Sequence, residues 1–471
     1  MILRSFIVIP LFLLLSVSLQ AQVYEIKVKI KGYQNDTLLL GYHFGDKTYI
    51  KDTAFRKIDQ FVFKGDSILE GGMYLLVLKP KNDFIQILID QDNQKFSCET
   101  DTFDISGNLK FKNSKLNQEF YAYLDFLDVQ RRMGDSLNAI HQAIDQEPIK
   151  IQIRKELDEI DVAVKARQKS IAEKPQLSLL TLLLNLGTEP EIPEFEGTEE
   201  EQREKAFYHY RTHFFDKVDL SDDRIVRLPL FHGKIERYLN KLTAQIPDSI
   251  NKALDYILSK APAKSYAFKY ILSTWLTQYA NSKYVGMDGI YVHLVEEYYA
   301  KGMGYWLDEE LLAKMLADAK TLKPLLLDKI APDITVYKQD GTPVSLHKVQ
   351  APYTILYIWA PDCGHCKSSM PSLLKFYENY KDKGVEILAL CSKVGEDEKA
   401  CWDAVKTLHM EPLTNTSDPL HRSKFRLTYD VKTTPVVYIL DKDKKILTKK
   451  IAAEQLSEVM EKLMSIDQNE D

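Results

Sequence analysis

The stretch of sequence that decides the fold of the C-terminal region runs from Tyr353 to Pro371 and reads YTILYIWAPDCGHCKSSMP. Its opening residues, 353–359, are nearly all apolar, which is typical of a central strand buried on both faces of a sheet. Cys363 and Cys366 follow this strand, and we expect a helix to begin at them. The stretch therefore predicts a strand, a short turn and a helix whose first turn holds two thiols.

A helix start gives Cys363 and Cys366 the geometry of an exchangeable pair, because residues three apart there have Cα atoms roughly 5 Å apart. Unpaired N–H groups and the positive end of the helix dipole favour the thiolate of Cys363, which is the nucleophile. We expect it to attack a client disulfide, and the more buried Cys366 to resolve the mixed disulfide. A charged His365 would favour the thiolate further, and Gly364 adds no side chain to block the approach.

Strand and helix patterns alternate from residue 325 onward, as a partly parallel sheet requires. Residues 334–337 and 343–346 flank Asp340-Gly341, a hairpin signal. Further strands are expected at residues 385–391, 436–440 and 446–449, with helices near residues 399–408 and from residue 454.

These motifs resemble the active site of the thioredoxin-like superfamily. The resemblance rests on Trp359, on the tetrad Cys363-Gly364-His365-Cys366 and on Pro371. The tetrad is similar to that of protein disulfide isomerases, whereas the leading hairpin and the inserted helix resemble the TlpA-like extracytoplasmic thiol-disulfide oxidoreductases of bacteria. The resemblance covers about residues 326–465.

The resemblance also implies a cis peptide bond between Thr434 and Pro435, packed against the cysteine pair. A proline there has no N–H, and the backbone of Thr434 could pair with an extended client segment as an added strand. The alternative is an ordinary proline at the start of an edge strand.

Two positions depart from the family pattern. Tyr357 stands where thioredoxins and isomerases carry a buried acid, and Ser369 stands where many TlpA-like proteins carry a glutamate. The sequence therefore does not identify the group that accepts the proton of Cys366, and a water or a more distant side chain could serve.

The five cysteines are too few for a scaffold stapled by disulfides. The alternative for Cys363 and Cys366 is a static disulfide or half of a zinc site that recruits Cys391 and Cys401. Zinc pairs usually come as two short knuckles, whereas Cys391 and Cys401 are ten apart. We therefore expect a buried thiol at Cys391 and a thiol on a helix surface at Cys401, with a second redox pair as the alternative, and a buried lone thiol at Cys98.

At 471 residues the chain is too long for one core, and we expect a multidomain α+β protein. Residues 1–21 have the pattern of a secretory signal peptide cleaved after Ala21, with an uncleaved anchor as the alternative. Residues 22–112 contain short strands punctuated by Gly, Asn and Asp, which predict an antiparallel β-sandwich. Residues 113–325 predict an α-helical region, with one apolar stripe from Phe268 to Tyr279, and residues 326–471 form the thioredoxin-like α/β domain.

Composition and charge limit the kinds of partner and the location that we expect for this chain. A net charge of -6 argues against a nucleic-acid surface spread over the protein. No stretch after residue 21 is long and apolar enough to span a membrane, so we expect a soluble mature chain in the periplasm or cell envelope. His209 and His213 could face one metal ion, but no convincing third ligand accompanies them, and we expect neither a metal nor a cofactor.

The sequence thus predicts a thiol-disulfide oxidoreductase that acts on protein clients, and the resemblance implies a membrane thiol-disulfide donor or acceptor. His365 predicts a pair that is less reducing than thioredoxin and nearer to the isomerases at about -180 mV. One alternative is an envelope binding or scaffold protein with an auxiliary redox domain. A lesser one is a peroxiredoxin-like peroxide reductase, against which stands Ala360, where peroxiredoxins place a Thr or Ser.

Overall fold

The computed structural model describes residues 23–470 and, for residues 467–470, only the backbone. The predicted signal peptide, residues 1–21, lies outside the described residues. The chain divides into two compact units, one ending at Arg237 and the other beginning at Tyr238. The helical region is thereby split between them, and the domain boundaries expected near residues 112 and 325 stay predictions.

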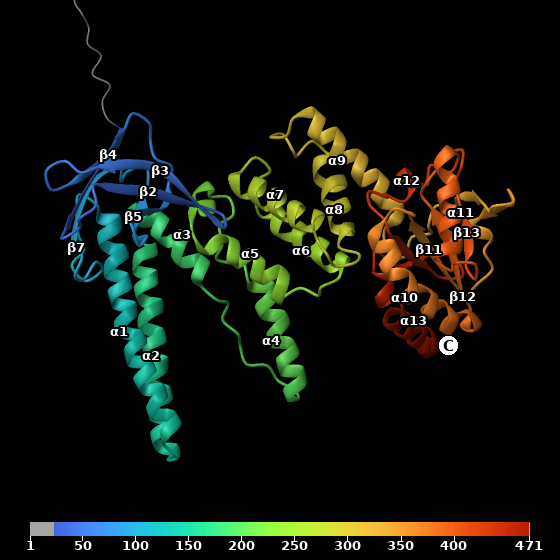
Figure 1. The fold of residues 1–471 in the computed structure, drawn as a ribbon. Coiled ribbons are helices and arrows are strands. Elements are labelled where there is room, and N and C mark those ends of the chain that lie inside the picture. The colour runs from blue at the N-terminus through green and yellow to red at the C-terminus, as the bar shows by residue number, and fades with distance from the viewer. Residues whose placement is uncertain (1–22, 471) are drawn as a thin grey trace, which may run out of the picture. The chain divides into compact units, whose positions relative to one another are not determined.

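Strands open the described part of the first unit (Figure 1). They are β1 (Tyr24–Lys31), β2 (Thr37–Phe44), β3 (Lys47–Phe55), β4 (Phe61–Gly65), β5 (Gly72–Leu78), β6 (Asp83–Ile89), β7 (Lys95–Asp101) and β8 (Lys110–Lys112). They form two sheets, in the orders β4-β1-β7-β8 and β3-β2-β5-β6. Buried side chains of both sheets, such as Ile26 and Leu76, belong to one hydrophobic cluster. The sandwich arrangement itself stays a prediction.

The prediction of a purely antiparallel domain is wrong at one pair of strands. β1 and β7 run parallel, from Glu25 opposite Lys95 to Lys31 opposite Asp101. Parallel strands need a long crossover connection, and here the intervening chain includes all four strands of the other sheet. The alternation of side chains along a strand reveals its faces but not the direction of its neighbour, so the sequence could not show this.

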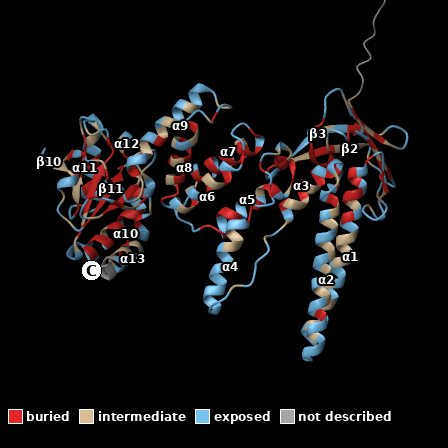
Figure 2. Ribbon diagram, turned by 180° about the vertical axis from the view of Figure 1, so that it is seen from behind, coloured by how far each residue is buried: buried red, intermediate tan, exposed pale blue. Residues whose placement is uncertain are grey.

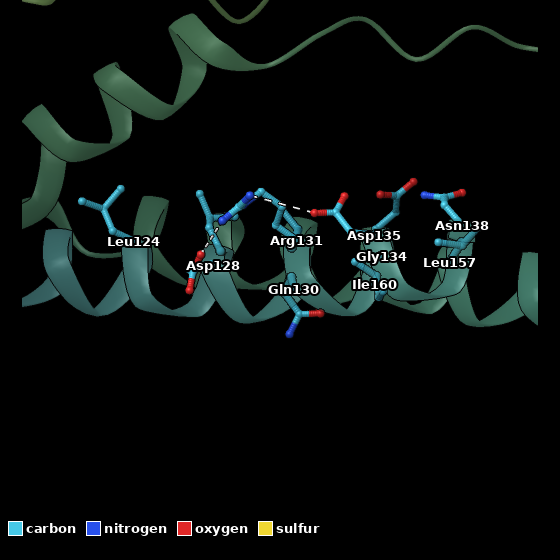
Figure 3. A pocket seen from close by; sticks show the side chains of 12 residues that line it. Leu124, Asp128, Gln130, Arg131, Gly134, Asp135, Asn138, Leu157 and Ile160 are labelled. Atoms are coloured by element: carbon cyan, nitrogen blue, oxygen red, sulfur yellow. Dashed lines mark hydrogen bonds and ion pairs between the residues drawn. The ribbon is translucent and has the colours of Figure 1, made fainter. Parts of the chain in front are cut away.

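Helices complete the first unit: α1 (Lys115–Ala143), α2 (Glu147–Ala172), α3 (Ser178–Gly187), α4 (Glu199–His213) and α5 (Leu230–Lys241), which runs into the second unit. α1 and α2 form a hairpin that is mostly exposed away from the sheets (Figure 2). A surface groove of about 680 Å³ lies between them, with Asp128, Arg131 and Asp135 along α1 (Figure 3). Arg131 forms ion pairs with both of these aspartates.

The second unit continues with α6 (Pro247–Ser259), α7 (Tyr266–Ala280), α8 (Asp288–Leu294) and α9 (Glu309–Leu322). The hydroxyl of Ser265 caps α7 by accepting the N–H of Phe268. The apolar stripe predicted on this helix is confirmed, since Phe268, Trp275 and Tyr279 are among its buried residues. Within the described part of the chain, no helix has the length and apolarity to cross a membrane.

The remaining elements follow α9 in the second unit. The strands are β9 (Thr335–Tyr337), β10 (Pro343–Ser345), β11 (Tyr353–Trp359), β12 (Val385–Cys391), β13 (Thr414–Thr416), β14 (Val436–Leu440) and β15 (Ile446–Lys449). The helices are α10 (Gly364–Tyr380), α11 (Glu398–Thr407), α12 (Phe425–Thr428) and α13 (Leu456–Glu470). The elements expected here from the sequence are present, whereas β13 and α12, of three and four residues, are too short for a periodic signal.

The central sheet has the order β13-β12-β11-β14-β15. β11, β12 and β13 are parallel, and β14 and β15 are each antiparallel to their inner neighbour. Every residue of β11 is buried, because one hydrophobic cluster covers each face of the sheet. The end of β11 therefore delivers the following turn and α10 to the edge of the sheet where parallel strands end.

Candidate dithiol site

Cys363 is the N-cap residue of α10, directly after the turn that follows β11. The N–H of Cys366 donates to the Sγ of Cys363 at 3.1 Å. The two cysteines are joined as a disulfide, with Cα atoms 5.2 Å apart. Cys363 is partly exposed, whereas Cys366 is 0% exposed. The first sulfur is therefore accessible from solvent, whereas the second is not.

The charges around Cys363 favour a thiolate. The first turn of α10 contains no acidic side chain, so nothing there opposes the positive end of the helix dipole. Asp362 precedes Cys363, but the Nζ of Lys393 lies 2.7 Å from its carboxylate. The hydrogen bond from Lys393 holds the pKa of Asp362 below its ordinary value. Sequence reasoning missed this ion pair, which joins positions far apart in the chain.

The loop before β14 meets the cysteines. The peptide bond between Thr434 and Pro435 is cis, as the resemblance implied. The carbonyl oxygen of Thr434 lies 3.2 Å from the Sγ of Cys363. β14 is hydrogen-bonded to β11, with Val436 opposite Ile358, and this pairing sets the loop beside the turn. The fold thus brings together two motifs that the sequence separates by about seventy residues.

Three more predicted residues surround the pair. Trp359 is 1% exposed and its Nε1 has no hydrogen-bond partner among the described residues. Gly364 and His365 are exposed, and a Cβ added at Gly364 would meet no atom within 4 Å. Gly364 therefore keeps the approach to Cys363 open without being required by packing.

An open cavity of about 550 Å³ adjoins the site. His365 and Ser369 of α10 line one part of it, and Pro435 and Lys450 line another. Glu454, from the short helix Ala453–Gln455, lines it as well. The cavity therefore lies beside the loop that touches Cys363, and it is bordered by charges of both signs.

The prediction for Cys391 and Cys401 is wrong. The two form a disulfide, with Cα atoms 6.1 Å apart, and each is 1% exposed. Cys391 ends β12 beside Trp359, and Cys401 lies on the buried face of α11 together with Val405. The helix was expected at the right place, but the face that it buries depends on how it packs against the sheet. With Cys391 and Cys401 joined to each other, neither is available as a thiolate ligand for a zinc site at Cys363 and Cys366.

The remaining candidates lie in the first unit. Cys98 is buried and free, as predicted, and burial raises the pKa of its thiol to about 12, which makes it unreactive. The rings of His209 and His213 lie 4.3 Å apart, but His209 contacts the carbonyl of Glu191 and His213 contacts Asp216. Among the described residues, no group of three or more His, Cys, Asp and Glu side chains could hold a metal ion.

Comparison with known families covers three parts of the chain. The Redoxin family matches residues 327–463. Two domains of unknown function, DUF4369 and DUF5106, match residues 24–120 and 159–320. The dithiol site therefore lies wholly within the Redoxin match.

Individual proteins are similar to the same region. Thiol-disulfide oxidoreductase ResA of Bacillus cereus is 32% identical over 136 residues, which are 29% of this chain and 75% of that protein. A domain of a possible thiol-disulfide isomerase from Cytophaga hutchinsonii has 32% identity and a TM-score of 0.29, covering 31% of this chain and 98% of that one.

A shorter similarity is to a plant protein from Mesembryanthemum crystallinum, "Probable phospholipid hydroperoxide glutathione peroxidase". It is 39% identical over 67 residues, which are 14% of this chain and 39% of that protein.

One assignment follows from the Redoxin match, the long similarity to ResA, the order of the sheet and the position of the cysteine pair. The chain belongs to the thioredoxin-like superfamily, and its C-terminal region is an oxidoreductase of that superfamily.

Proposed function

We propose that this chain exchanges disulfides with protein clients in the cell envelope through Cys363 and Cys366. One observation carries the proposal: a partly exposed sulfur at the N-cap of α10 is bonded to a sulfur that is fully buried. When the pair is reduced, the helix N-terminus favours the thiolate of Cys363, which forms a mixed disulfide with the client. Cys366 then attacks the Sγ of Cys363 and the client leaves as a thiol.

The loop at Pro435 would select extended client segments. The carbonyl oxygen of Thr434 already lies beside the Sγ of Cys363, so a client cysteine bound to that sulfur would lie close to this backbone. Backbone pairing of this kind gives affinity without demanding a particular client sequence. The direction of electron flow depends on the reduction potentials of the cysteine pair and of the partner that resets it. We propose that this partner is a membrane thiol-disulfide protein.

Trapping tests the assignment of roles. Cys366→Ser removes the resolving thiol, so we expect the variant expressed in the native envelope to accumulate mixed disulfides on Cys363. Non-reducing electrophoresis followed by mass spectrometry identifies the attached proteins and the linked cysteine. Cys363→Ser is the matched control and is expected to trap nothing. Trapping by Cys363→Ser in place of Cys366→Ser would reverse the two roles.

Peroxide reduction is a second candidate, favoured by the similarity to the glutathione peroxidase over 67 residues. A peroxide reductase would convert the Cys363 thiolate to a sulfenic acid, which Cys366 would condense to the disulfide. We expect thiol-disulfide exchange to dominate, because Ala360 places no hydroxyl side chain ahead of Cys363. Turnover of hydrogen peroxide by the reduced protein at a rate comparable with disulfide exchange would favour the second candidate.

A further inference from the structure

The proton of Cys366 needs a way out of the protein. On the proposed function, the Cys366 thiol must lose its proton before it can attack the mixed disulfide at Cys363, because the thiolate is the nucleophile. The side chain of Cys366 is 0% exposed and belongs to the apolar cluster between α10 and the sheet. Burial of this kind opposes ionisation, so a polar group close by must take the proton during the step.

Tyr357 lies in the same cluster as Cys366. It is 0% exposed, and its hydroxyl has no direct hydrogen-bond partner among the described residues. Burial raises the pKa of Tyr357, the Ser369 hydroxyl opposes that rise, and the carboxylate of Glu454 adds to it. The phenol therefore stays protonated and can pass a proton on but cannot keep one as a base. Ser369 and Glu454, the two groups that influence this pKa, line the same cavity.

Ser369 connects this buried hydroxyl with the cavity beside the site. It lies on α10 one turn after Cys366, and its hydroxyl donates to the carbonyl oxygen of Cys366 at 3.4 Å. That bond is long and leaves the hydroxyl free to turn, since the mode for O–H···O bonds is about 2.7 to 2.8 Å. Ser369 also lines the open cavity that Glu454 borders.

Glu454 is the carboxylate best placed to receive the proton. The charged and titratable groups that border the cavity are His365, Asp430, Lys432, Lys450 and Glu454. Asp430 is engaged by Lys432 at 3.2 Å and by Lys450 at 3.4 Å. Glu454 is exposed and makes no ion pair with any residue that the structure describes. Its neighbour Ala453 belongs to the same hydrophobic cluster as Tyr357 and Cys366.

We propose that Glu454 accepts the proton of Cys366 through the hydroxyls of Ser369 and Tyr357. In the resolving step the S–H bond of Cys366 breaks and its proton passes along the hydroxyls to the Glu454 carboxylate. The resulting thiolate forms the bond between Cys366 and Cys363, and the bond between Cys363 and the client sulfur breaks. The client leaves as a thiolate and takes up a proton from solvent, while Glu454 returns its own to solvent. The cysteine pair is oxidised and the client disulfide is reduced.

Two-phase kinetics with an aromatic disulfide test this proposal. Reduced protein is mixed with excess dithiobis-nitrobenzoate in a stopped-flow instrument, and release of the coloured thiolate is followed. Attack by Cys363 releases the first thiolate, and resolution by Cys366 releases the second. We expect Glu454→Gln to leave the first phase unchanged and to slow the second about a hundredfold near neutral pH, the low end of the range for general acid–base catalysis. Tyr357→Phe and Ser369→Ala should slow the second phase as well.

The pH profile separates proton transfer from a structural defect. The deficit of Glu454→Gln should shrink as the pH rises past the titration of an ordinary thiol at about 8.5, because solvent then takes the proton directly. The variant Glu454→Asp should retain part of the second-phase rate, and formate added to Glu454→Gln should restore part of it. Glu458→Gln, the same change on the exposed face of α13, is the matched control and should behave as the wild type.

The outcomes are distinct. Absence of a first phase in the wild type would remove the proposed function itself. A normal first phase with an unchanged second phase in Glu454→Gln at every pH would overturn the relay alone. If only His365→Ala slows the second phase, the imidazole is the proton acceptor. If Glu454→Gln slows the second phase equally at every pH and formate does not restore the rate, the role of Glu454 is merely structural.

Discussion

The exposed imidazole of His365 lies between the two cysteines in the sequence. Its positive form would stabilise the thiolate of Cys363, which belongs to the reduced state of the pair. A stabilised reduced state raises the reduction potential and makes the disulfide a better oxidant. This single side chain therefore influences the direction in which the pair transfers electrons.

We predict that His365→Ala makes the potential of the pair more negative by about 30 mV, which corresponds to about 1.4 kcal/mol for a two-electron couple. The reduction potential of the pair is measured by equilibration in glutathione buffers, followed by alkylation and mass spectrometry. His347→Ala, also an exposed histidine in this domain, should leave the potential unchanged. A wild-type potential at or below thioredoxin's value of about -270 mV would contradict our expectation for this tetrad.

At the scale of elements, the disulfide between Cys391 and Cys401 ties the end of β12 to α11. The segment between them includes the turn with Lys393, which pairs with Asp362 next to the reactive cysteine. Because both sulfurs are buried, we expect this bond to persist under conditions that reduce Cys363 and Cys366. We expect this bond to hold the segment that contains Lys393.

We predict that replacing both Cys391 and Cys401 with Ala lowers the free energy of unfolding by about 2 to 3 kcal/mol, the loop-closure contribution of a short disulfide-bonded segment. Urea denaturation of the non-reduced protein measures the change. Cys98→Ala, a small truncation in the first unit, is the control and should not alter unfolding of the second unit. An unchanged urea midpoint for the double variant would show that the disulfide is dispensable.

At the scale of the whole molecule, the redox domain is anchored to helices that precede it. The ammonium of Lys449 in β15 contacts the carboxylate of Asp288 in α8 and the carbonyl of Leu325. The side chain of Lys449 is 3% exposed, and burial lowers its pKa, an effect that Asp288 opposes. Removal of the helices would separate this charge from both of its partners, which is costly.

We therefore predict that a fragment of residues 238–471 folds and reduces small disulfides as the whole chain does, whereas residues 326–471 alone are less stable by about 3 kcal/mol. Urea denaturation of both fragments measures the difference. Lys449→Met in the shorter fragment should recover part of the loss, because it removes the unpaired charge. Equal stability of the two fragments would mean that the contacts of Lys449 contribute nothing.

The same fragments address the alternative of a binding or scaffold protein. Trapping with Cys366→Ser in the whole chain and in residues 238–471 shows whether the first unit recruits clients. An identical set of trapped proteins favours a simple enzyme, and the loss of particular clients assigns recruitment to residues 23–237.

The sequence alone predicted the proposed reactive centre of this protein. A buried strand, two cysteines at the start of a helix and a proline before a later strand are local patterns, and the properties of a helix N-terminus follow from its own backbone. Tertiary structure alone decided the parallel pairing of β1 with β7, the disulfide between Cys391 and Cys401, and the meeting of Asp362 with Lys393. It also brought Ser369 and Glu454 to the edge of one cavity. The physical reason is that these contacts join residues far apart in the chain, and they depend on the direction and rotation of each element as it packs, which local periodicity does not specify.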